Sequence, residues 1–523
     1  MASSAWVGSL DPDQGVKNLA KDYPGDWHRD PWMWPEHTYL LKPGQELLTR
    51  WFRDPRTHTP SLVDVPKDNW GHRPAVVLHP IDKIGYQTLV DFLSVKLIGN
   101  LSTNAYGWRL DRGVPAAGKY ALEKHEWKNY RSHLEALSLH YEAALATDIV
   151  SCFASVEPGQ LLDAIAARTG KSAPGEALGM FLSGFQETPN RQGLPQRSRA
   201  SSVLANLFLM RMDDVLAKGS SRIPRRADYY LHKQQKSTWV RWMDDMWVFG
   251  KYAHELRALQ LELDATASRH GLHLNSGKTR LLEGERMREV VLELEHSAVD
   301  HEIVFDGINP ALEAMIDKIL DDANSANRTE VKFALSRMSQ QGVTHREDEL
   351  LEQADRMPHC ADSFARHVAY SRSPNECESW VKARIRSKWA GSYQWSLANY
   401  LGAVNSAHKA SAWIKDWAGE RIEDKNTQLP LLAVCCQRLS VWSPDTARAA
   451  IAARISSESD PHSRRVLSLA ALSAGMPAQD VRKWLSAHED NELTHKMMDA
   501  QSFVGSSHLR WGLVESSGDQ EHA

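Results

Sequence analysis

The segment VRWMDDMWVFG, residues 240–250, sets Asp244 and Asp245 inside a run of Val, Trp, Met and Phe. The apolar residues on both sides predict two short strands, and the simplest connection between them is a β-hairpin with the carboxylates at its turn. Two adjacent carboxylates in such a segment are costly, because each loses hydration and repels the other. An isolated Asp-Asp pair is also common in solvated turns, so the rest of the chain must decide between a turn and a site.

Length and composition restrict the class of protein. The 523 residues suggest two to four domains, and 42% hydrophobic with 24% charged residues is typical of globular proteins. The net charge of −4 excludes a globally basic nucleic-acid binder, so charge must be read locally. Five Cys without a CxxC pair indicate a reducing compartment, and we expect a cytoplasmic protein. No signal peptide and no membrane partner are expected, because no apolar run reaches about 18 residues.

Three zones follow one another along the chain. Residues 1–70 are rich in Pro, Trp and Asp and predict an irregular N-terminal arm. Residues 71–305 mix helical and strand patterns, and residues 306–523 are almost entirely short amphipathic helices. Ser443-Pro444 predicts a helix start, with Ser443 as the N-cap. The C-terminal zone therefore predicts a helical-repeat or bundle domain, although no clean period is present.

Further segments before and after the hairpin in the sequence contain candidate catalytic or metal-binding residues. Asp148 lies in a second apolar strand pattern, ATDIVSCF, and Lys278 follows a short strand in LHLNSGKT. Between them, QGLPQ feeds a helix that begins near SSVLANLFL. Three carboxylates on adjacent strands can hold two divalent cations, and Mg²⁺ prefers such ligands. A second Met-Asp-Asp, residues 212–214, lies near the end of that helix, where we expect Asp213 and Asp214 to be solvated.

These segments, in this order, resemble the reverse transcriptases. The strand with Asp148, the GLPQ turn with its helix, the WMDD hairpin and LHLNSGKT resemble four consecutive motifs of that family. The resemblance implies an α+β fold, in which a right-hand polymerase fingers-palm domain has an antiparallel sheet with helices. It covers roughly residues 70–290, and the all-α helical-repeat domain would replace the thumb.

The resemblance also implies residue roles. The catalytic residues would be Asp148, Asp244, Asp245 and Lys278. The metal, Mg²⁺ or alternatively Mn²⁺, would be held by Asp148, Ile149, Asp244 and Asp245. The incoming dNTP would contact Phe153, Gln196, Arg197, Arg73 and Arg109. Phe153 would exclude a 2′-hydroxyl, and Lys278 would neutralise or protonate the pyrophosphate.

Three positions depart from the family pattern. Arg197 replaces the usual Gly after LPQ, Ser201-Ser202 replaces Ser-Pro, and Trp242 replaces the usual Tyr of the hairpin. These changes lie beside the expected nucleotide and primer positions. They put ordinary processive copying of a template in doubt.

Local charge favours a polyanionic partner. Residues 188–241 hold 11 Lys or Arg against 3 Asp, a net charge of +8. Basic and aromatic residues interleave there, which suits phosphate contacts and base stacking on single-stranded nucleic acid. The candidate nucleic-acid-binding residues are Arg199, Arg225, Arg226, Lys233 and Lys236.

The layout is similar to that of the bacterial abortive-infection and other defence-associated reverse transcriptases. No Cys/His cluster suggests a zinc-bearing endonuclease, and no second acidic cluster suggests an RNase H. The resemblance implies antiphage defence, a homo-oligomer (trimer or hexamer), and single-stranded DNA made without a conventional template and attached to the protein.

Two alternatives remain open. The enzyme could copy a dedicated noncoding RNA into a defined cDNA. The helical domain could instead be an interaction scaffold, with the palm serving only as a nucleotide-dependent switch.

Overall fold

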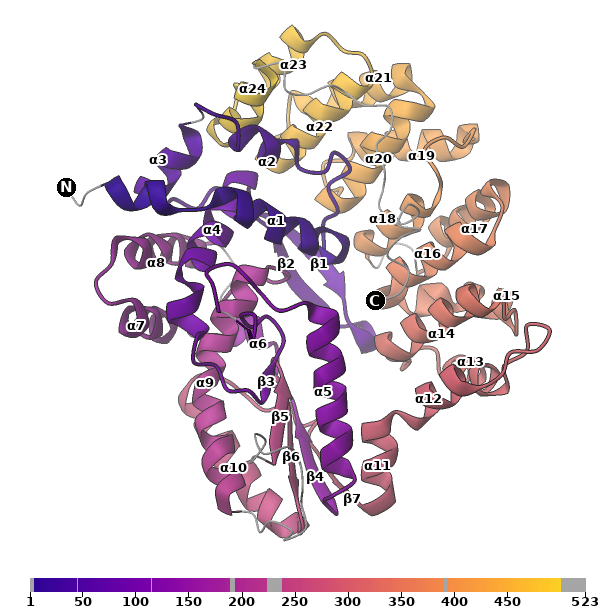
Figure 1. The fold of residues 1–523 in the computed structure, drawn as a ribbon. Helices are drawn as coiled ribbons and strands as arrows, with labels where there is room; N and C mark the ends of the chain where they lie inside the picture. The colour runs from indigo at the N-terminus through magenta and orange to yellow at the C-terminus, as the bar shows by residue number, and fades with distance from the viewer. Residues whose placement is uncertain are drawn as a thin grey trace. The chain divides into compact units, whose positions relative to one another are not determined.

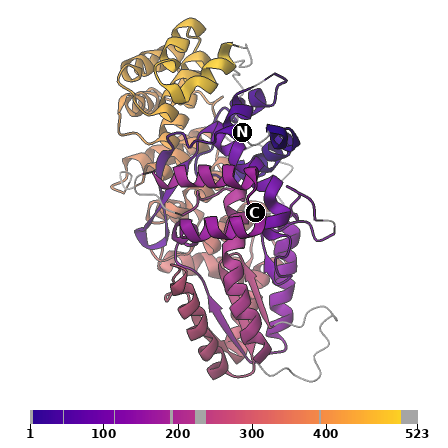
Figure 2. The same cartoon turned by 90° about the vertical axis from the view of Figure 1, so that its left-hand side faces the viewer.

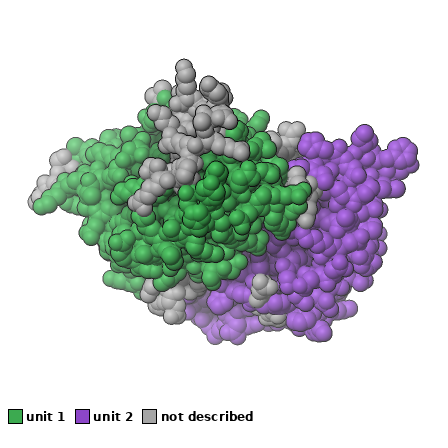
Figure 3. Space-filling model, turned by 90° about the horizontal axis from the view of Figure 1, so that it is seen from below, with its two compact units in different colours: residues 1–22, 46–57, 82–294 green, residues 23–45, 58–81, 295–523 purple. Residues whose placement is uncertain are grey.

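The computed structural model describes residues 4–44, 46–113, 115–188, 193–222, 238–389 and 393–499. Figure 1 shows a mixed α and β fold. The chain forms two compact units, which are coloured separately in Figure 3. Unit 1 comprises residues 1–22, 46–57 and 82–294, and unit 2 comprises residues 23–45, 58–81 and 295–523.

Unit 1 combines a small sheet with helices. Its strands are β3 (Ala105–Tyr106), β4 (Ala143–Thr147), β5 (Trp239–Trp242), β6 (Asp245–Gly250) and β7 (Arg280–Glu283). Its helices are η1 (Ser4–Ser9), α1 (Pro12–Asp22), α3 (Leu47–Arg53), α4 (Pro80–Ile98), α5 (Glu123–Ser138), α6 (Cys152–Ser155), α7 (Pro158–Thr169), α8 (Ala173–Gln186), α9 (Arg199–Arg222), α10 (Ala253–Arg269) and α11 (Gly284–Leu292).

The strand order in the sheet is β3-β5-β6-β4-β7. β3 pairs with β5 in parallel, and the other pairings are antiparallel. Helix α5 packs against β3, β5 and β6, whereas α10 packs against β4, β6 and β7 and α9 packs against β5. Figure 1 and Figure 2 show the sheet between these helices. The predicted sheet with helices is therefore present, but it is mixed and not purely antiparallel, because the short edge strand β3 runs parallel to β5.

Strand alternation divides the side chains between the two faces of the sheet. Val240 and Phe249 lie in the core cluster with Tyr130 and Leu134 of α5, so their face turns toward α5. Residues at odd positions of β5 turn the other way, toward α9. This alternation decides which residues of the Asp-Asp hairpin meet which helix.

Unit 2 is built around helices. Its strands are β1 (Ser61–Pro66) and β2 (His72–Val77), which form an antiparallel pair. Its helices are η2 (Tyr23–Gly25), α2 (Pro35–Leu40), η3 (Asp68–Trp70), α12 (Leu294–His301), α13 (Pro310–Asp321), α14 (Arg328–Gln341), α15 (Glu347–Glu352), η4 (Gln353–Arg356), η5 (Pro358–Cys360), α16 (Ala361–Ser371), α17 (Pro374–Arg386), α18 (Gln394–Ala403), α19 (Ala412–Glu423), α20 (Leu429–Trp442), α21 (Pro444–Ile455), α22 (Pro461–Ser473), α23 (Ala478–Leu485), η7 (Glu489–Asn491) and α24 (Glu492–Asp499).

The long helices of unit 2 stack in a row. Helix α14 packs on α16, α16 on α18, α18 on α20 and α20 on α22, so each contacts the next but one along the chain. The helices between them pack on their sequence neighbours, as α21 does on α20 and α22. β1 packs against α18 and α20. Figure 1 shows this succession in orange and yellow.

Residues 23–45 of unit 2 are held to the last helices of that unit by buried charge. Arg465 of α22 donates hydrogen bonds to Asp30 at 3.0 Å and to Glu36 at 2.7 Å, and all three side chains are buried. Thr494 donates to the same Glu36 at 2.8 Å. Burying these charges costs free energy, and this cost is compensated because each carboxylate accepts hydrogen bonds from Arg465.

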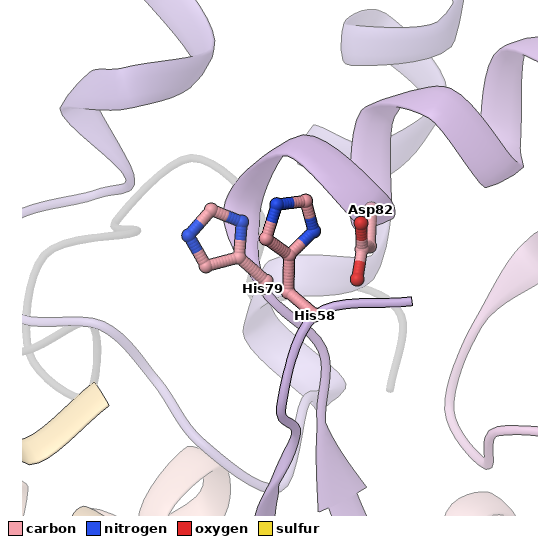
Figure 4. Close-up of side chains that lie close together, drawn as sticks. All are labelled: His58, His79 and Asp82. Atoms are coloured by element: carbon pink, nitrogen blue, oxygen red, sulfur yellow. The ribbon is translucent and has the colours of Figure 1, made fainter. Parts of the chain in front are cut away.

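His79 serves the packing of unit 2. Its ring stacks on that of His58 with centroids 4.4 Å apart, as Figure 4 shows, and its Nε2 donates to the carbonyl of Asp490 at 2.8 Å. Burial, followed by the neighbouring His58 and His462, holds the pKa of His79 well below its usual 6.5. A neutral, hydrogen-bonded imidazole is therefore part of the core.

The five cysteines are free and buried. Within the described ranges, no helix has both the length and the apolar character that crossing a bilayer requires.

Two local features predicted from the sequence, the start of α21 and the solvation of Asp213 and Asp214, are present only in part. Helix α21 begins at Pro444 with Ser443 as its N-cap, as predicted, but the Ser443 hydroxyl pairs with the Thr446 hydroxyl and makes no side-chain cap bond. The expected solvation of the second Asp-Asp pair is wrong for Asp213, which is only 6% exposed well inside α9, and correct for Asp214.

Helices α3 and α4 approach each other closely at Gly85, and a substitution there tests the packing of unit 1. A Cβ on Gly85 would lie 2.2 Å from the Trp51 ring, whose Nε1 is fixed by a 2.9 Å hydrogen bond to Asp82. We expect Gly85→Ala to destabilise unit 1 by roughly 1–3 kcal/mol, because the held ring cannot yield. Thermal unfolding measures the effect.

Gly179→Ala is the matched control, since its Cβ would meet Leu162 at an ordinary 3.6 Å. This change should be neutral or stabilising by up to about 1 kcal/mol, because Ala favours a helix. Equal melting temperatures for the two variants would contradict the packing argument.

Candidate active site

The predicted hairpin is present at the centre of the sheet. Trp242 is the last residue of β5 and pairs with Asp245, the first residue of β6. Met243 and Asp244 form the two-residue turn between them, and Met243 has a φ of 52°. A left-handed conformation at a non-glycine residue costs on the order of 1 kcal/mol, so the surroundings must hold this turn.

Sheet register brings Asp148 to the hairpin. Thr147 at the end of β4 pairs with Met246, so the next position places Asp148 opposite Asp245. The Asp148 carbonyl accepts a 2.7 Å hydrogen bond from the amide of Asn275, and the Ile149 amide donates to Oδ1 of Asp148 at 2.9 Å. The carboxylates therefore come together because two central strands end at the same edge of the sheet.

Lys278 completes the group. Its Nζ lies 2.8 Å from Oδ2 of Asp148, and its backbone is fixed by a turn in which its amide donates to the Asn275 carbonyl at 3.0 Å. Burial alone would lower the pKa of Lys278, but the hydrogen bond and charge of Asp148 outweigh burial and raise it. The ammonium side chain remains 68% exposed, so it can reach a ligand from solvent.

The electrostatics show an excess of negative charge. Desolvation first, and then the charge of Asp148, raise the pKa of Asp244 above its usual 3.8. The same two causes raise the pKa of Asp245 to about 6, against hydrogen bonds from Tyr130 and Trp247. Asp245 keeps an exposed surface, and Asp244 is half-buried. One lysine does not balance three carboxylates, and a bound cation would.

The donor set fits a divalent cation. Carboxylate oxygens in this arrangement are the ligands that Mg²⁺ prefers. In this structure the three carboxylates do not form a group whose ligand oxygens all lie within 4.8 Å of one another. The fit to a cation therefore rests on the chemistry of the donors and not on a preformed cluster.

The GLPQ turn is docked beside Asp148. Gly193 has a φ of 72°, and a Cβ there would lie 2.1 Å from the Phe153 carbonyl, so only glycine fits. The Leu194 amide donates to that same carbonyl at 2.8 Å. Phe153 and Gln196 are half-buried, and Arg197 is exposed with a φ of 58°. These three residues thus stand on the segments next to Asp148.

The other predicted arginines are engaged within the fold. Arg109 is buried and donates to the carbonyls of Ser102 and Ala105 at 3.0 and 2.6 Å. Arg199 is buried at the start of α9, where its amide and guanidinium bond Asp22 at 2.9 and 3.3 Å.

Arg73 is in β2 of unit 2, with its guanidinium 5.8 Å from the centroid of the Trp27 ring. Arg225, Arg226, Lys233 and Lys236 lie outside the described residues.

An aromatic cluster adjoins the hairpin. Trp242 lies 5.0 Å from Trp127, 5.7 Å from Tyr130 and 6.1 Å from Trp108 between ring centroids. The Tyr130 hydroxyl donates to Oδ2 of Asp245 at 3.4 Å. Sequence reasoning singled out Trp242 but missed its partners, because Trp108 and Trp127 carry no motif of their own.

Sequence reasoning also missed Arg241. It is a fully buried guanidinium paired with Asp213 at 2.6 Å. The one available signal was a charged residue between two apolar residues of a strand.

Comparison with known proteins agrees with this geometry. The sequence model of the reverse transcriptase (RNA-dependent DNA polymerase) family matches residues 65–333, just over half of the chain. A search among curated proteins finds no match. Members of this family use dNTPs with a nucleic-acid template and generally require divalent metal ions. The match spans the β4 end, the hairpin and Lys278 together, and the chain therefore belongs to the reverse transcriptase family and is an RNA-directed DNA polymerase.

Proposed function

We propose that Asp148, Asp244, Asp245 and Lys278 form the polymerase centre and that the enzyme works in antiphage defence by abortive infection. The observation that carries the first part is the meeting of β4 and β6, which puts three carboxylates and one lysine at a single sheet edge. Their uncompensated charge supports Mg²⁺, with Mn²⁺ as an alternative.

Each residue has a distinct task in this proposal. Asp148 and Asp244 would be the principal ligands, with Asp245 and the Ile149 backbone in support. When bound, two metal ions activate a 3′-hydroxyl and stabilise the leaving pyrophosphate. Lys278 supplies a proton or a positive charge to that pyrophosphate, because its exposed ammonium already stands at the carboxylates.

The nucleotide would lie between the Asp148 strand and the GLPQ turn. Phe153 would pack under its sugar, and Gln196 and Arg197 would contact it from the turn. The half-buried side chain of Phe153 supports this role, because a core residue would be fully enclosed. The internal bonds of Arg109 and Arg199 give no support to the nucleotide and nucleic-acid contacts proposed for them.

The defence role rests on domain layout. We divide the chain into an arm (1–70), fingers and palm (71–305) and a helical-repeat domain (306–523) in place of a thumb. The stacking of α14, α16, α18, α20 and α22 on one another supports a repeat, because each helix pair buries its apolar face on the next. A homo-oligomer, a trimer or hexamer in the cytoplasm, is part of the same proposal.

Product analysis distinguishes the modes of synthesis. Nucleic acid purified with the protein would be sequenced before and after denaturation and protease treatment. A homopolymer or random sequence that protease releases supports untemplated, protein-primed synthesis. A cDNA complementary to one noncoding RNA, free of protein, supports the templated alternative.

Removing the hairpin charges should abolish activity. We expect Asp244→Asn with Asp245→Asn to lower dNTP incorporation at least about a hundredfold, because the metal loses its charged ligands. The melting temperature in metal-free buffer should stay equal or rise, since asparagine relieves the carboxylate repulsion. Primer-extension assays and thermal melts measure the two effects.

Asp214→Asn is the control, because it changes an exposed carboxylate in the other Met-Asp-Asp. Retained incorporation by the double hairpin variant would refute the proposed centre. Catalytic variants that still protect cells from phage would favour the alternative of a scaffold with a nucleotide-dependent switch.

Shortening Phe153 should relax sugar selection. We expect Phe153→Ala to raise rNTP incorporation relative to dNTP at least about tenfold, because the clash with the 2′-hydroxyl is removed. Competition assays with matched nucleotide pairs measure this ratio. Phe185→Leu, in the buried core of α8, should lower stability and leave the ratio unchanged; an unchanged ratio in Phe153→Ala would exclude the sugar contact.

A further inference from the structure

A fully buried arginine stands immediately before the hairpin turn. Arg241 of β5 has an exposed fraction of 0%. Its Nε donates to Oδ1 of Asp213 at 2.6 Å, and its Nη2 donates to Oδ2 of the same residue at 2.9 Å. This two-point pairing fixes the plane of the guanidinium against α9.

The third nitrogen of the guanidinium reaches the turn. Nη1 of Arg241 donates to the Met243 carbonyl at 3.1 Å and to Oδ1 of Asn206 at 2.8 Å. Asn206 in turn donates through Nδ2 to the Gly107 carbonyl at 2.9 Å. The network therefore connects α9, the segment after β3 and the turn of the hairpin.

The turn needs such support. Met243, directly before Asp244, has a positive φ that an L-residue adopts only where its surroundings impose it. The network bonds its carbonyl, and its amide donates to the Tyr106 carbonyl at 3.3 Å. Both backbone polar groups of Met243 are thus hydrogen-bonded to partners in other parts of unit 1.

Side chains alternate along β5, so the Arg241 side chain does not lie on the same face of the sheet as Asp245. Trp242 and its partner Asp245 face α5, where Tyr130 contacts both residues. Arg241 is the neighbour of Trp242 along the strand, so it faces α9 and its partner Asp213. Its effect on the carboxylates must pass through the backbone of Met243 and Asp244.

We propose that Arg241, Asp213 and Asn206 are positioning residues that hold the turn so that the Asp244 carboxylate is presented to the metal. This inference rests on the metal-binding role proposed above for Asp244. A buried ion pair by itself adds little net stability compared with apolar residues of similar volume, so its value here is geometric. Residues that orient metal ligands typically affect metal affinity by about 10–100-fold when changed.

The test replaces the ion pair without leaving a lone buried charge. Arg241→Met combined with Asp213→Leu should fold, because both partners become apolar together. Mn²⁺ alone, titrated and followed by its paramagnetic resonance, should bind at least about tenfold more weakly than to the wild-type chain. The kcat for dNTP addition should fall by a similar factor, with KM for dNTP changed by less than about threefold.

Arg454→Met combined with Glu458→Leu is the matched control in unit 2. That ion pair is similarly buried, with a 2.7 Å bond, and joins Arg454 of α21 to Glu458 just after this helix. Its Mn²⁺ affinity should equal that of the wild type, which separates a positioning effect from a general loss of stability.

Different outcomes test the positioning role of Arg241 and Asp213 and the proposed metal site itself. Wild-type Mn²⁺ affinity and kcat in the Arg241/Asp213 double variant would overturn the positioning inference. Wild-type Mn²⁺ affinity in Asp244→Asn would overturn the proposed metal site itself. If the double variant does not fold, Asn206→Ala, which keeps the Arg241–Asp213 ion pair and removes the hydrogen bonds of Asn206 to Arg241 and to the Gly107 carbonyl, must show the same weakening of Mn²⁺ binding for the inference to stand.

Discussion

Repulsion among the carboxylates of Asp148, Asp244 and Asp245 is the constraint on which the rest of unit 1 depends. Folding brings these groups to one edge because β4 and β6 pair antiparallel, so that β6 begins where β4 ends. Burial first, and then the charge of Asp148, raise the pKa values of Asp244 and Asp245, so repulsion adds to the cost of desolvation there. The sheet can impose it because its strands are buried between α5 on one face and α9 with α10 on the other. The packed sheet thus holds several negative charges close together, and a divalent cation bound there, as we propose, would reduce their repulsion.

The two Met-Asp-Asp sequences of this chain take opposite parts in that frame. In residues 243–245 the carboxylates lie at the hairpin beside Asp148, where we propose the polymerase centre, whereas in α9 Asp213 is the buried counter-ion of Arg241. Arg241 belongs to the strand that leads into the first of these sequences. One sequence therefore presents charge and the other uses charge to hold the turn, because alternation sends Arg241 toward α9 and Asp245 toward α5.

Trp242 differs from the Tyr that the family resemblance leads one to expect, and its surroundings give this a structural reason. The indole fills a space between Trp127, Tyr130 and Trp108, and aromatic side chains pack edge to face there. Trp127 is 45% exposed, so part of the cluster borders solvent next to Asp245. The departure at Trp242 is thus one part of a larger aromatic cluster beside Asp245.

The sequence by itself determined the hairpin, the strand with Asp148, the helix after GLPQ and the helical character of residues beyond 306, because these depend on local periodicity and turn chemistry. The family match then confirmed the class of enzyme. Only the tertiary structure decided which individual polar side chains are buried and which groups they bind. Asp213 was expected in solvent and is buried, while Arg109 was expected at the nucleotide and instead binds backbone carbonyls. The physical reason is that a charged side chain is buried only when a partner distant in sequence meets it. The local sequence pattern indicates which face of its helix or strand a residue occupies. The packing of the elements decides which distant residue becomes its partner.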